Sequence, residues 1–365
     1  MGKSVGLLLT LSLGLIGIYG MTVVLEKPLH MHMEKEWQEV AQQQEMGEFY
    51  NPDSSLSHPL VLLTNDQQEP LLFYADILTP VCIDGTCKPV YIELYWNLIG
   101  NYVGYGIDQT QPLTKFDHDN FIAADYEKLH QLLLDNNSVL SRRKLEDLFD
   151  ADVQPEKKVT YKGVEVDAVT GATRKEIKDS VIEGALYSCY TLWHLVHGQV
   201  RHKIEDYLRS IYSRELGDSL LYSNYPDYQF YALKNMEAVE YHRHLPQLAH
   251  IFKEREPLIR NYILKKLPKE AWKEARFSEE LYSAFSKIDL NSRTLLLKNL
   301  SHANLNAATL LSEQVSKMTK NQLKMYLRFL EEDESRLSPT IKANLVQIVS
   351  KEEYTFTYLI SAFLE

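Results

Sequence analysis

Hydrophobic runs in the first half of the chain predict short β-strands joined by turns. The runs lie at Leu60–Leu63, Leu71–Ile77, Val90–Trp96, Asn101–Ile107, Val159–Tyr161 and Val164–Val169. Their β-branched and aromatic residues, bounded by turn residues, are typical of strands. The residues 97–101 separate two of the runs by a tight connection, so we expect an antiparallel pair there. A helical period over Ile122–Leu134 places Ile122, Tyr126, Leu129 and Leu133 on one side. The pattern predicts an α+β domain.

After Arg201 the β-type pattern fades and short amphipathic segments follow one another. Examples are Ile204–Tyr212, Phe230–Val239, Leu245–Phe252, Leu258–Leu267, Arg293–Leu300, Ala307–Val315, Leu323–Leu330, Ile341–Val349 and Phe356–Leu364. Few of these segments are long enough to be stable alone. Short helices joined by brief turns are typical of α-solenoids, although no regular repeat period is visible. We expect an all-α, HEAT-like helical array, with an irregular helical bundle as the alternative.

The amino terminus contains a long uncharged segment. Val5–Val24 has no charged residue, and twenty residues of helix are long enough to cross a hydrocarbon core. No small-x-small cleavage pattern follows, which favours an uncleaved membrane anchor over a signal peptide. Lys3 on the inner side would place the rest of the chain in the periplasm or outside the cell. A cleaved signal would instead release the protein into the same compartment.

Turn chemistry and charge define the remaining boundaries. Residues 34–44 are polar and compatible with a helix, and Gly47–Pro59 is rich in turn residues, which predicts a tether. Residues 1–199 carry 15 basic and 28 acidic side chains, whereas residues 200–365 carry 24 and 22. We therefore expect a membrane segment at 1–26, a tether at 27–58, an α+β domain at 59–200 and a helical array at 201–365.

The overall composition excludes two classes of protein. The 365 residues are 45% hydrophobic and 24% charged, which is too apolar for a largely disordered chain. The net charge of −11 argues against a nucleic-acid binder, which would present a basic face. Three cysteines are too few for a disulfide-stapled mini-protein. Both domains must therefore be held together mainly by burial of apolar side chains.

The segment Val164–His197 carries the most informative chemistry. A strand ends there, Gly171 allows a tight bend, and a long helix is predicted to begin at Thr173. Such a junction offers backbone N–H groups and the positive end of a helix dipole, which suit a phosphate. Thr173 and Glu176 also form a T-x-x-E capping box. The spacing of Thr173 and Glu176 alone favours a helix cap as the simpler interpretation of Thr173.

The residues Asp167-Ala-Val-Thr170-Gly171-Ala172-Thr173 resemble the D-x-x-(S/T)-G-A-T motif of the FMN-binding domain family. That family includes flavin-carrying subunits of the sodium-translocating NADH:quinone reductase and of Rnf complexes. The resemblance covers about residues 159–185 and, more loosely, residues 60–200. Family members often have Ser or Thr after the motif, whereas this chain has Arg174, whose guanidinium is electrostatically favourable beside a phosphodiester.

The resemblance implies a covalent flavoprotein. In the family, a flavin transferase uses FAD to esterify the last threonine to FMN through its phosphate, outside the cytoplasm. Thr173 would be the acceptor, Thr170, Gly171 and Ala172 would shape the loop, and Asp167 would belong to the sequence recognised by the transferase. The chain would then be an electron carrier or redox subunit that exchanges electrons with partner proteins, rather than an autonomous enzyme. A noncovalent FMN binder and an envelope scaffold that works through its helical array are the alternatives.

A pair of cysteines flanks a predicted turn. If Asp84–Gly85 forms a two-residue hairpin turn, Cys82 and Cys87 face each other across it. That geometry suits a disulfide, which we favour over free thiols and over redox or metal chemistry in an exported protein. Cys189 stands alone in an apolar segment and is expected to be a buried thiol.

Other histidines, acids and aromatic residues carry weaker patterns. His194 and His197, and likewise His242 and His244, could in principle ligate a metal, but no third ligand is evident. Residues 117–119, Asp-His-Asp, are more typical of a polar loop. Several aromatic residues are candidates to contact a flavin ring: Tyr95, Trp96, Tyr102 and Trp193. The spacing contains no Ser/His/Asp nucleophile arrangement, P-loop or dinucleotide fingerprint, and predicts no metal site.

Overall fold

A computed structural model describes residues 27–51, 56–81, 88–115, 118–144, 148, 160–161, 164–165, 175–351 and 353–365. The chain divides into two units, with Ile211 the last residue of the first and Tyr212 the first residue of the second. The predicted boundary at 200/201 differs from this division by one helix, α5 (Gln199–Ile211). No helix within the described ranges is long and apolar enough to cross a membrane, and Val5–Val24 lies outside those ranges.

The first unit contains a six-stranded antiparallel sheet with the order β1-β6-β5-β4-β3-β2. The strands are β1 (His30–Met31), β2 (Gln42–Tyr50), β3 (Ser57–Thr64), β4 (Pro70–Thr79), β5 (Val90–Trp96) and β6 (Tyr102–Gly106). The predicted antiparallel pair is confirmed, because β5 pairs with β6 across residues 97–101. A separate two-stranded ladder joins β7 (Thr160–Tyr161) and β8 (Val164–Glu165).

The predicted tether at 27–58 is wrong, because these residues contribute to the sheet. They contain β1, the short helix α1 (Glu34–Gln38) and the edge strand β2. Most side chains of β2 are exposed, so the strand shows no hydrophobic alternation until Phe49, which is fully buried. Gly47 has φ +96°, and the register with β3 shifts between Glu45 and Glu48. This β-bulge also interrupts the alternation of residues along β2, so the sequence shows no clear strand pattern there.

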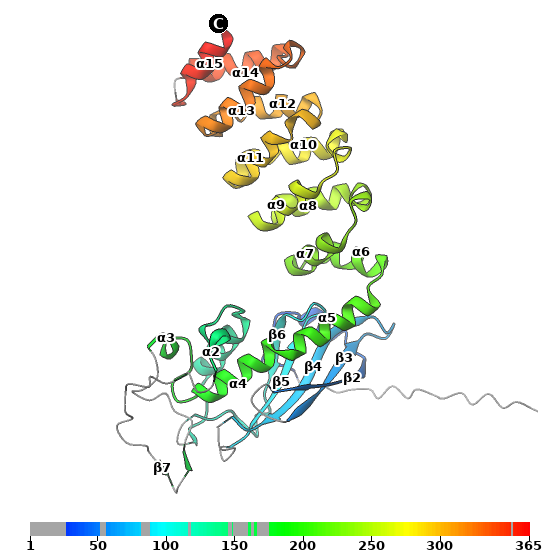
Figure 1. Ribbon diagram of the computed structural model, residues 1–365, viewed down its shortest axis with the longest axis vertical. Coiled ribbons are helices and arrows are strands. Elements are labelled where there is room, and N and C mark those ends of the chain that lie inside the picture. The colour runs from blue at the N-terminus through cyan, green and yellow to red at the C-terminus, as the bar shows by residue number, and fades with distance from the viewer. Residues whose placement is uncertain are drawn as a thin grey trace, which may run out of the picture. The chain divides into compact units, whose positions relative to one another are not determined.

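The two faces of the sheet are covered by different helices. Helices α2 (Ala123–Leu134), α4 (Leu186–His197) and α5 belong to one face, and α4 and α5 run along the sheet in Figure 1. The indole Nε1 of Trp96 donates to the Val196 carbonyl of α4 at 3.0 Å. Its neighbour Tyr95 lies beside Trp37 of α1. Because successive side chains of a strand point to opposite faces, α1 and α4 cover opposite sides of the sheet.

Helix α2 matches the predicted helix, but one residue that was predicted on its buried side is exposed. Leu129 and Leu133 are buried as expected. Ile122, predicted on the same side, is the N-cap residue and remains 62% exposed. An N-cap residue has an extended backbone, so its side chain does not follow the helical period. The 3-10 helix η2 (Val139–Arg142) follows α2 after a short turn.

The single long helix predicted from Thr173 to His197 is also wrong. The structure has a short helix α3 (Lys175–Lys178) and then α4, which begins at Leu186. Gly184 between them has φ +78°, a left-handed conformation that interrupts the helix and that glycine adopts without strain. The apolar residues after Gly184 do pack in the core as predicted, since ten of the twelve α4 residues are buried.

The second unit is a helical array, as the sequence predicts. Its α-helices are α6 (Arg214–Tyr222), α7 (Pro226–Asn235), α8 (Leu245–Glu254), α9 (Pro257–Lys266), α10 (Ala275–Ser283), α11 (Leu290–Lys298), α12 (Leu305–Ser312), α13 (Lys320–Glu331), α14 (Pro339–Ser350) and α15 (Thr357–Leu364). Between them lie the 3-10 turns η4 (Ala238–His244), η5 (Ala271–Lys273), η6 (Phe285–Lys287), η7 (Leu300–His302), η8 (Val315–Lys317) and η9 (Glu334–Arg336). The example segments named from the sequence include no counterpart of α6 or α10, in each of which three of nine residues are charged.

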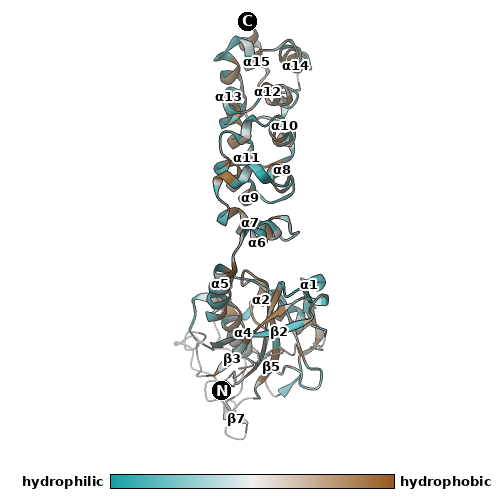
Figure 2. Cartoon of the chain, turned by 90° about the vertical axis from the view of Figure 1, so that its right-hand side faces the viewer, coloured by the Kyte–Doolittle hydropathy of each residue, from teal (hydrophilic) through white to brown (hydrophobic). Residues whose placement is uncertain are grey.

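The helices of the second unit stack in two columns. The first helices of the pairs (α6, α8, α10, α12, α14) lie on one side and the second helices (α7, α9, α11, α13, α15) on the other (Figure 1). Contacts run within pairs and between successive pairs, for example α10 with α12 and α9 with α11. In Figure 2 the helices carry both hydrophobic and hydrophilic residues, as expected when one face of each is buried.

A repeat becomes visible once the second helices are aligned. Four of them begin at Pro226, Pro257, Leu290 and Lys320, which are 31, 33 and 30 residues apart. The eighth residue of each of these helices is a buried leucine: Leu233, Leu264, Leu297 and Leu327. Connectors of unequal length hide this period in the sequence.

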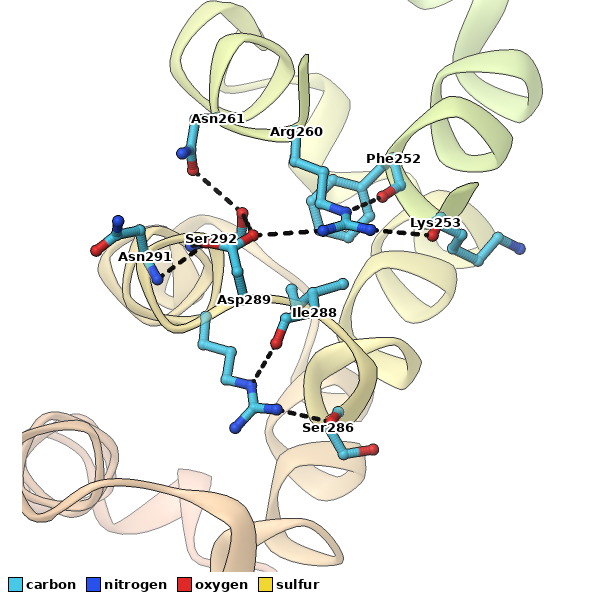
Figure 3. Close-up of polar contacts among 10 residues, drawn as sticks. Phe252, Lys253, Arg260, Asn261, Ser286, Ile288, Asp289, Asn291 and Ser292 are labelled. Carbon is cyan, nitrogen blue, oxygen red and sulfur yellow. Dashed lines mark hydrogen bonds and ion pairs between the residues drawn. The ribbon is translucent and has the colours of Figure 1, made fainter. Parts of the chain in front are cut away.

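A polar network between successive pairs surrounds the Asp289 carboxylate (Figure 3). Arg260 donates to the Phe252 carbonyl at 2.9 Å and to Asp289 at 3.4 Å, and Ser292 Oγ donates to Asp289 at 2.6 Å. Burial alone would raise the pKa of Asp289, but the hydrogen bonds from Ser292 and Arg260 outweigh it and hold this pKa below its ordinary value. The network joins α9 to α11.

Candidate functional site

The residues predicted to carry FMN lie outside the described residues. These are Asp167, Thr170, Gly171, Ala172 and Thr173. The described elements on either side are β8, which ends at Glu165, and α3, which begins at Lys175. The motif therefore connects a strand to a helix, as the sequence predicts. Helix α3 has four residues and aligns few peptide dipoles, so its N-terminus attracts a phosphate less strongly than the N-terminus of a long helix would.

The chain that follows the motif is anchored in the core of the first unit. Ile177, Val181 and Ile182 are buried, with at most 1% exposure. Lys128 of α2 donates a hydrogen bond to the Val181 carbonyl, and the Tyr190 hydroxyl of α4 donates to the Arg143 carbonyl at 3.4 Å. These contacts fix the end of the motif segment to α2 and to the residue after η2. A group attached at Thr173 would therefore be two residues from an immobilised helix.

The described part of the first unit also contains a histidine cluster that the sequence patterns did not single out. The Tyr102 hydroxyl lies 2.9 Å from Nδ1 of His130, and Nε2 of His130 lies 2.8 Å from Nε2 of His32. The His30 ring stacks on His130, with centroids 4.5 Å apart and an interplanar angle of 11°. Nδ1 of His30 lies 3.8 Å from a carboxylate oxygen of Glu127. Residues 30–32, β6 and α2 supply these side chains.

The environment disfavours protonation of the central histidine. Burial, followed by the nearby His30 and His32, lowers the pKa of His130 to about 4, although Glu127 acts in the opposite direction. Burial also lowers the pKa of His30, against the effect of Glu127. Two neutral rings that share a hydrogen bond need one N–H donor and one acceptor. If Tyr102 donates to Nδ1, then Nε2 of His130 carries the proton and donates to His32.

This arrangement links the exposed His32 to the buried phenol of Tyr102 by hydrogen bonds through His130, and burial raises the pKa of Tyr102 well above its ordinary value. Tyr102 is 6% exposed, whereas His32 is exposed. The sequence signal that could have found the cluster is His30-Met31-His32, because residues two apart in an extended segment share a face. Within the described ranges, no group of three or more His, Cys, Asp or Glu side chains is arranged to hold a metal.

A cavity adjoins the histidine cluster. It has a volume of about 600 Å³ and is lined on one side by Lys27, Leu29 and His30. The facing wall comes from the loop and helix start at Ile107, Gln109, Pro112, Asn120, Phe121, Ala123 and Tyr126. The lining combines apolar side chains with four polar ones, those of Lys27, His30, Gln109 and Asn120.

The remaining histidine candidates have structural contacts. Nε2 of His197 lies 2.9 Å from the Leu133 carbonyl, and burial lowers the pKa of His197 to about 4. His194 packs between the rings of Tyr190 and Trp193. His244 lies 3.1 Å from Asp218, whereas His242 is exposed. Asp117 lies outside the described residues, and His118 is in a loop with φ +63°.

The predicted aromatic and cysteine residues are mostly buried. Tyr95, Trp96, Tyr102 and Trp193 are each 6% exposed or less, so their rings are core components in the described structure. Cys189 is a buried thiol in α4, as predicted, and its Sγ accepts from Ile182 N at 3.5 Å. Cys82 and Cys87 lie outside the described residues.

Comparison of the whole chain with models of known protein families, with curated proteins and with solved structures found no match. The flavinylation motif at Asp167–Thr173 therefore stays a prediction from the residues themselves.

Proposed function

We propose that the chain is an extracytoplasmic electron-transfer flavoprotein that carries FMN covalently, through a phosphoester, on Thr173. The observation that carries the proposal is the sequence Asp167-Ala-Val-Thr-Gly-Ala-Thr173. Its position between β8 and α3, and the buried anchor that follows it, support the proposal. The uncharged Val5–Val24 segment supports export, which the modification requires, and also supports membrane attachment.

Each residue of the motif has a proposed role. Thr173 supplies the hydroxyl oxygen that forms the ester, with AMP leaving from FAD when the flavin transferase acts. Thr170, Gly171 and Ala172 shape the loop, and Asp167 is recognised by the transferase. FMN supplies the electron chemistry when bound, and the protein holds it and limits which redox partners reach it. An FMN-binding-type fold for the first unit and a HEAT-type fold for the second are parts of the same proposal.

Intact mass measurement tests the proposal. The chain without residues 1–26 is produced in the periplasm together with a flavin transferase. We expect the mass to rise by one FMN less one water, and Thr173→Ala to lack the increase. Thr173→Ser is the matched control and should retain part of the modification, because it keeps a hydroxyl. Undiminished covalent flavin in Thr173→Ala would refute the assignment.

The same measurement separates the alternatives. Flavin that is lost on denaturation would indicate a noncovalent FMN binder, for which the cavity beside His30 is the described candidate site. Absence of flavin, when a positive-control protein is modified, would favour an envelope scaffold with Thr173 as a helix cap. The helical array favours this second candidate function, because stacked helix pairs present extended surfaces for partner proteins.

A further inference from the structure

The two columns of the helical array differ in charge. The second helices carry nine basic and two acidic side chains, the acids being Asp227 in the first turn of α7 and Glu331 at the end of α13. The first helices carry four basic and five acidic side chains. The surplus of positive charge therefore belongs to one column, while the connectors mix both signs.

Four of these basic residues occupy the same position of the repeat. The ninth residue of each of the helices α7, α9, α11 and α13 is Lys234, Lys265, Lys298 and Arg328, respectively. All four side chains are exposed. Helix α9 contacts α11, α11 contacts α13, and the Phe230 ring of α7 contacts the Tyr262 ring of α9. These four residues therefore recur at one position along the stacked second helices, and we call them the basic column.

The basic column differs from the cations that stabilise the array internally. Arg260 and Arg293, at the fourth position of their helices, donate to backbone carbonyls of their own pairs, those of Phe252 and Ser286, and Arg293 also donates to the Lys317 carbonyl of the next pair. In contrast, the ion pairs found in the described part of the chain include no member of the basic column. The Lys234 Nζ lies 4.3 Å from the centroid of the Phe230 ring. The helix dipole favours a basic residue near each helix C-terminus. Lys265 and Lys298 have no acidic residue within four positions along the chain, whereas Glu237 follows Lys234 and Glu331 follows Arg328, each by three residues.

We propose that the basic column binds an acidic, extended segment of a partner protein. Packed helices lie about 8–10 Å apart, which sets the spacing between successive charges of the column. A polyproline II segment rises about 9 Å every three residues, which make one turn, so acidic residues at every third position face the same side. Such a segment matches the column in both charge and spacing.

The flanking side chains favour a polypeptide over a membrane. Three residues before each member of the basic column stands Tyr231, Tyr262, Leu295 or Met325, and all four are only partly exposed. They can pack against a peptide backbone between charged contacts. The strongly exposed apolar residues Leu258 and Leu290 instead lie in the first turns of their helices, at the other end from the basic column. A face that enters lipid would carry such residues beside its cations.

Peptide binding to the full-length protein in nonionic detergent tests this proposal. The probe is a fluorescent peptide of four Glu-Pro-Pro repeats, compared with four Gln-Pro-Pro repeats. We expect saturable binding of the Glu peptide that weakens with salt, and much weaker binding of the Gln peptide. The triple variant Lys265→Gln, Lys298→Gln, Arg328→Gln should raise the Kd about tenfold or more.

The matched control removes three exposed lysines outside the basic column: Lys287→Gln, Lys317→Gln, Lys342→Gln. This variant has the same net charge change and should alter the Kd less than about twofold. Equal losses in both triple variants, equal binding of both peptides, or no saturable binding would overturn the proposal. Preferential binding of phosphatidylglycerol vesicles or single-stranded DNA through the column would also overturn it. The flavin state of Thr173 does not affect this outcome.

Discussion

The two units are stabilised by contacts of very different range along the chain. In the first unit, Trp96 bonds to Val196 and Arg201 bonds to Asn101, each across 100 residues. In the second unit, the bonds of Ser292 to Asn261 and Gln322 to Leu290 span 31 and 32 residues, which is about one repeat. Long-range contacts make the first unit depend on all its parts, whereas each repeat of the second depends on its neighbours.

The difference in contact range suits the roles proposed for the two units, which are cofactor binding for the first and partner binding for the second. A cofactor site needs rigid surroundings. In the first unit, α3 and α4 are held in place by contacts with α2, η2 and the sheet. A docking surface needs length, which the array reaches by adding helix pairs. The difference also implies that substitutions in the two units have different consequences.

Trp96→Ala should have the largest effect on stability. The side chain is fully buried between the sheet and α4, and its loss also leaves the Val196 carbonyl without its donor. We expect a loss of about 3–5 kcal/mol in the first unit. Calorimetry should show the transition of the first unit move while that of the second remains. A single shared shift of both transitions would show that the units do not unfold independently.

Removal of the predicted disulfide should cost about 2 kcal/mol in the first unit. The register pairs Thr79 with Val90, and three further residues along each chain lead to Cys82 and Cys87. We therefore expect the Cys82→Ser, Cys87→Ser variant to unfold at lower denaturant concentration. Alkylation before and after reduction, read by mass, checks the bond itself. Full alkylation of the unreduced, denatured wild type would contradict it.

Acid should weaken the first unit through His130. Its pKa is about 4 in the folded state and 6.5 in the reference state, so the unfolded chain binds more protons between these values. This contribution is complete above pH 6.5 and declines as the pH falls toward 4. Because solvent reaches His32, which is hydrogen-bonded to His130, it screens a charge on His130. We therefore expect the loss of unfolding free energy to be about 1–2 kcal/mol.

Chemical denaturation at pH 7 and pH 4.5 measures this contribution. His130→Gln keeps hydrogen-bonding groups but cannot become charged, so its stability should fall less between the two pH values. An identical decline in the wild type and the variant would show that other groups cause the acid sensitivity.

Asp289→Asn should destabilise the array by about 1–2 kcal/mol, because it weakens charge-assisted bonds from Arg260 and alters the bond to Ser292. The transition of the second unit should shift and broaden, since the link between α9 and α11 is loosened. Asp333→Asn, at an exposed carboxylate in a connector, is the matched control and should change little. Equal effects of the two variants would exclude a special role for the network.

Tyr282→Phe should have the smallest effect, about 1 kcal/mol, because it removes only the hydroxyl that donates to the Leu296 carbonyl at 2.8 Å. Tyr326→Phe removes a similar bond to Ala308 and should cost about the same. Tyr282 lies in a first helix and Tyr326 in a second helix, so similar shifts in urea midpoints would indicate that bonds from either column to the other helix of the pair contribute equally. A much larger effect of either variant would indicate that the two bonds contribute unequally.

Periodic segments were predicted well because their hydrophobic pattern reflects burial directly. The strand Val90–Trp96 and the helix ending at Leu134 were found with nearly correct bounds. Strand β2 was missed because its exposed edge carries polar residues, and the break at Gly184 was missed because the flanking residues are all helix-compatible. The cluster of His32, His130 and Tyr102 could not be predicted, since its members come from separate segments.

The α+β and all-α regions could be predicted from the amino-acid pattern, which also contains the motif at Asp167–Thr173 on which the flavin proposal rests. These features are local, because helical or strand period and motif spacing are properties of neighbouring residues. The folded structure was needed to show that residues 30–50 join the sheet and that Lys234, Lys265, Lys298 and Arg328 share one position in successive second helices. Both depend on how distant segments pair and stack, which local spacing does not specify.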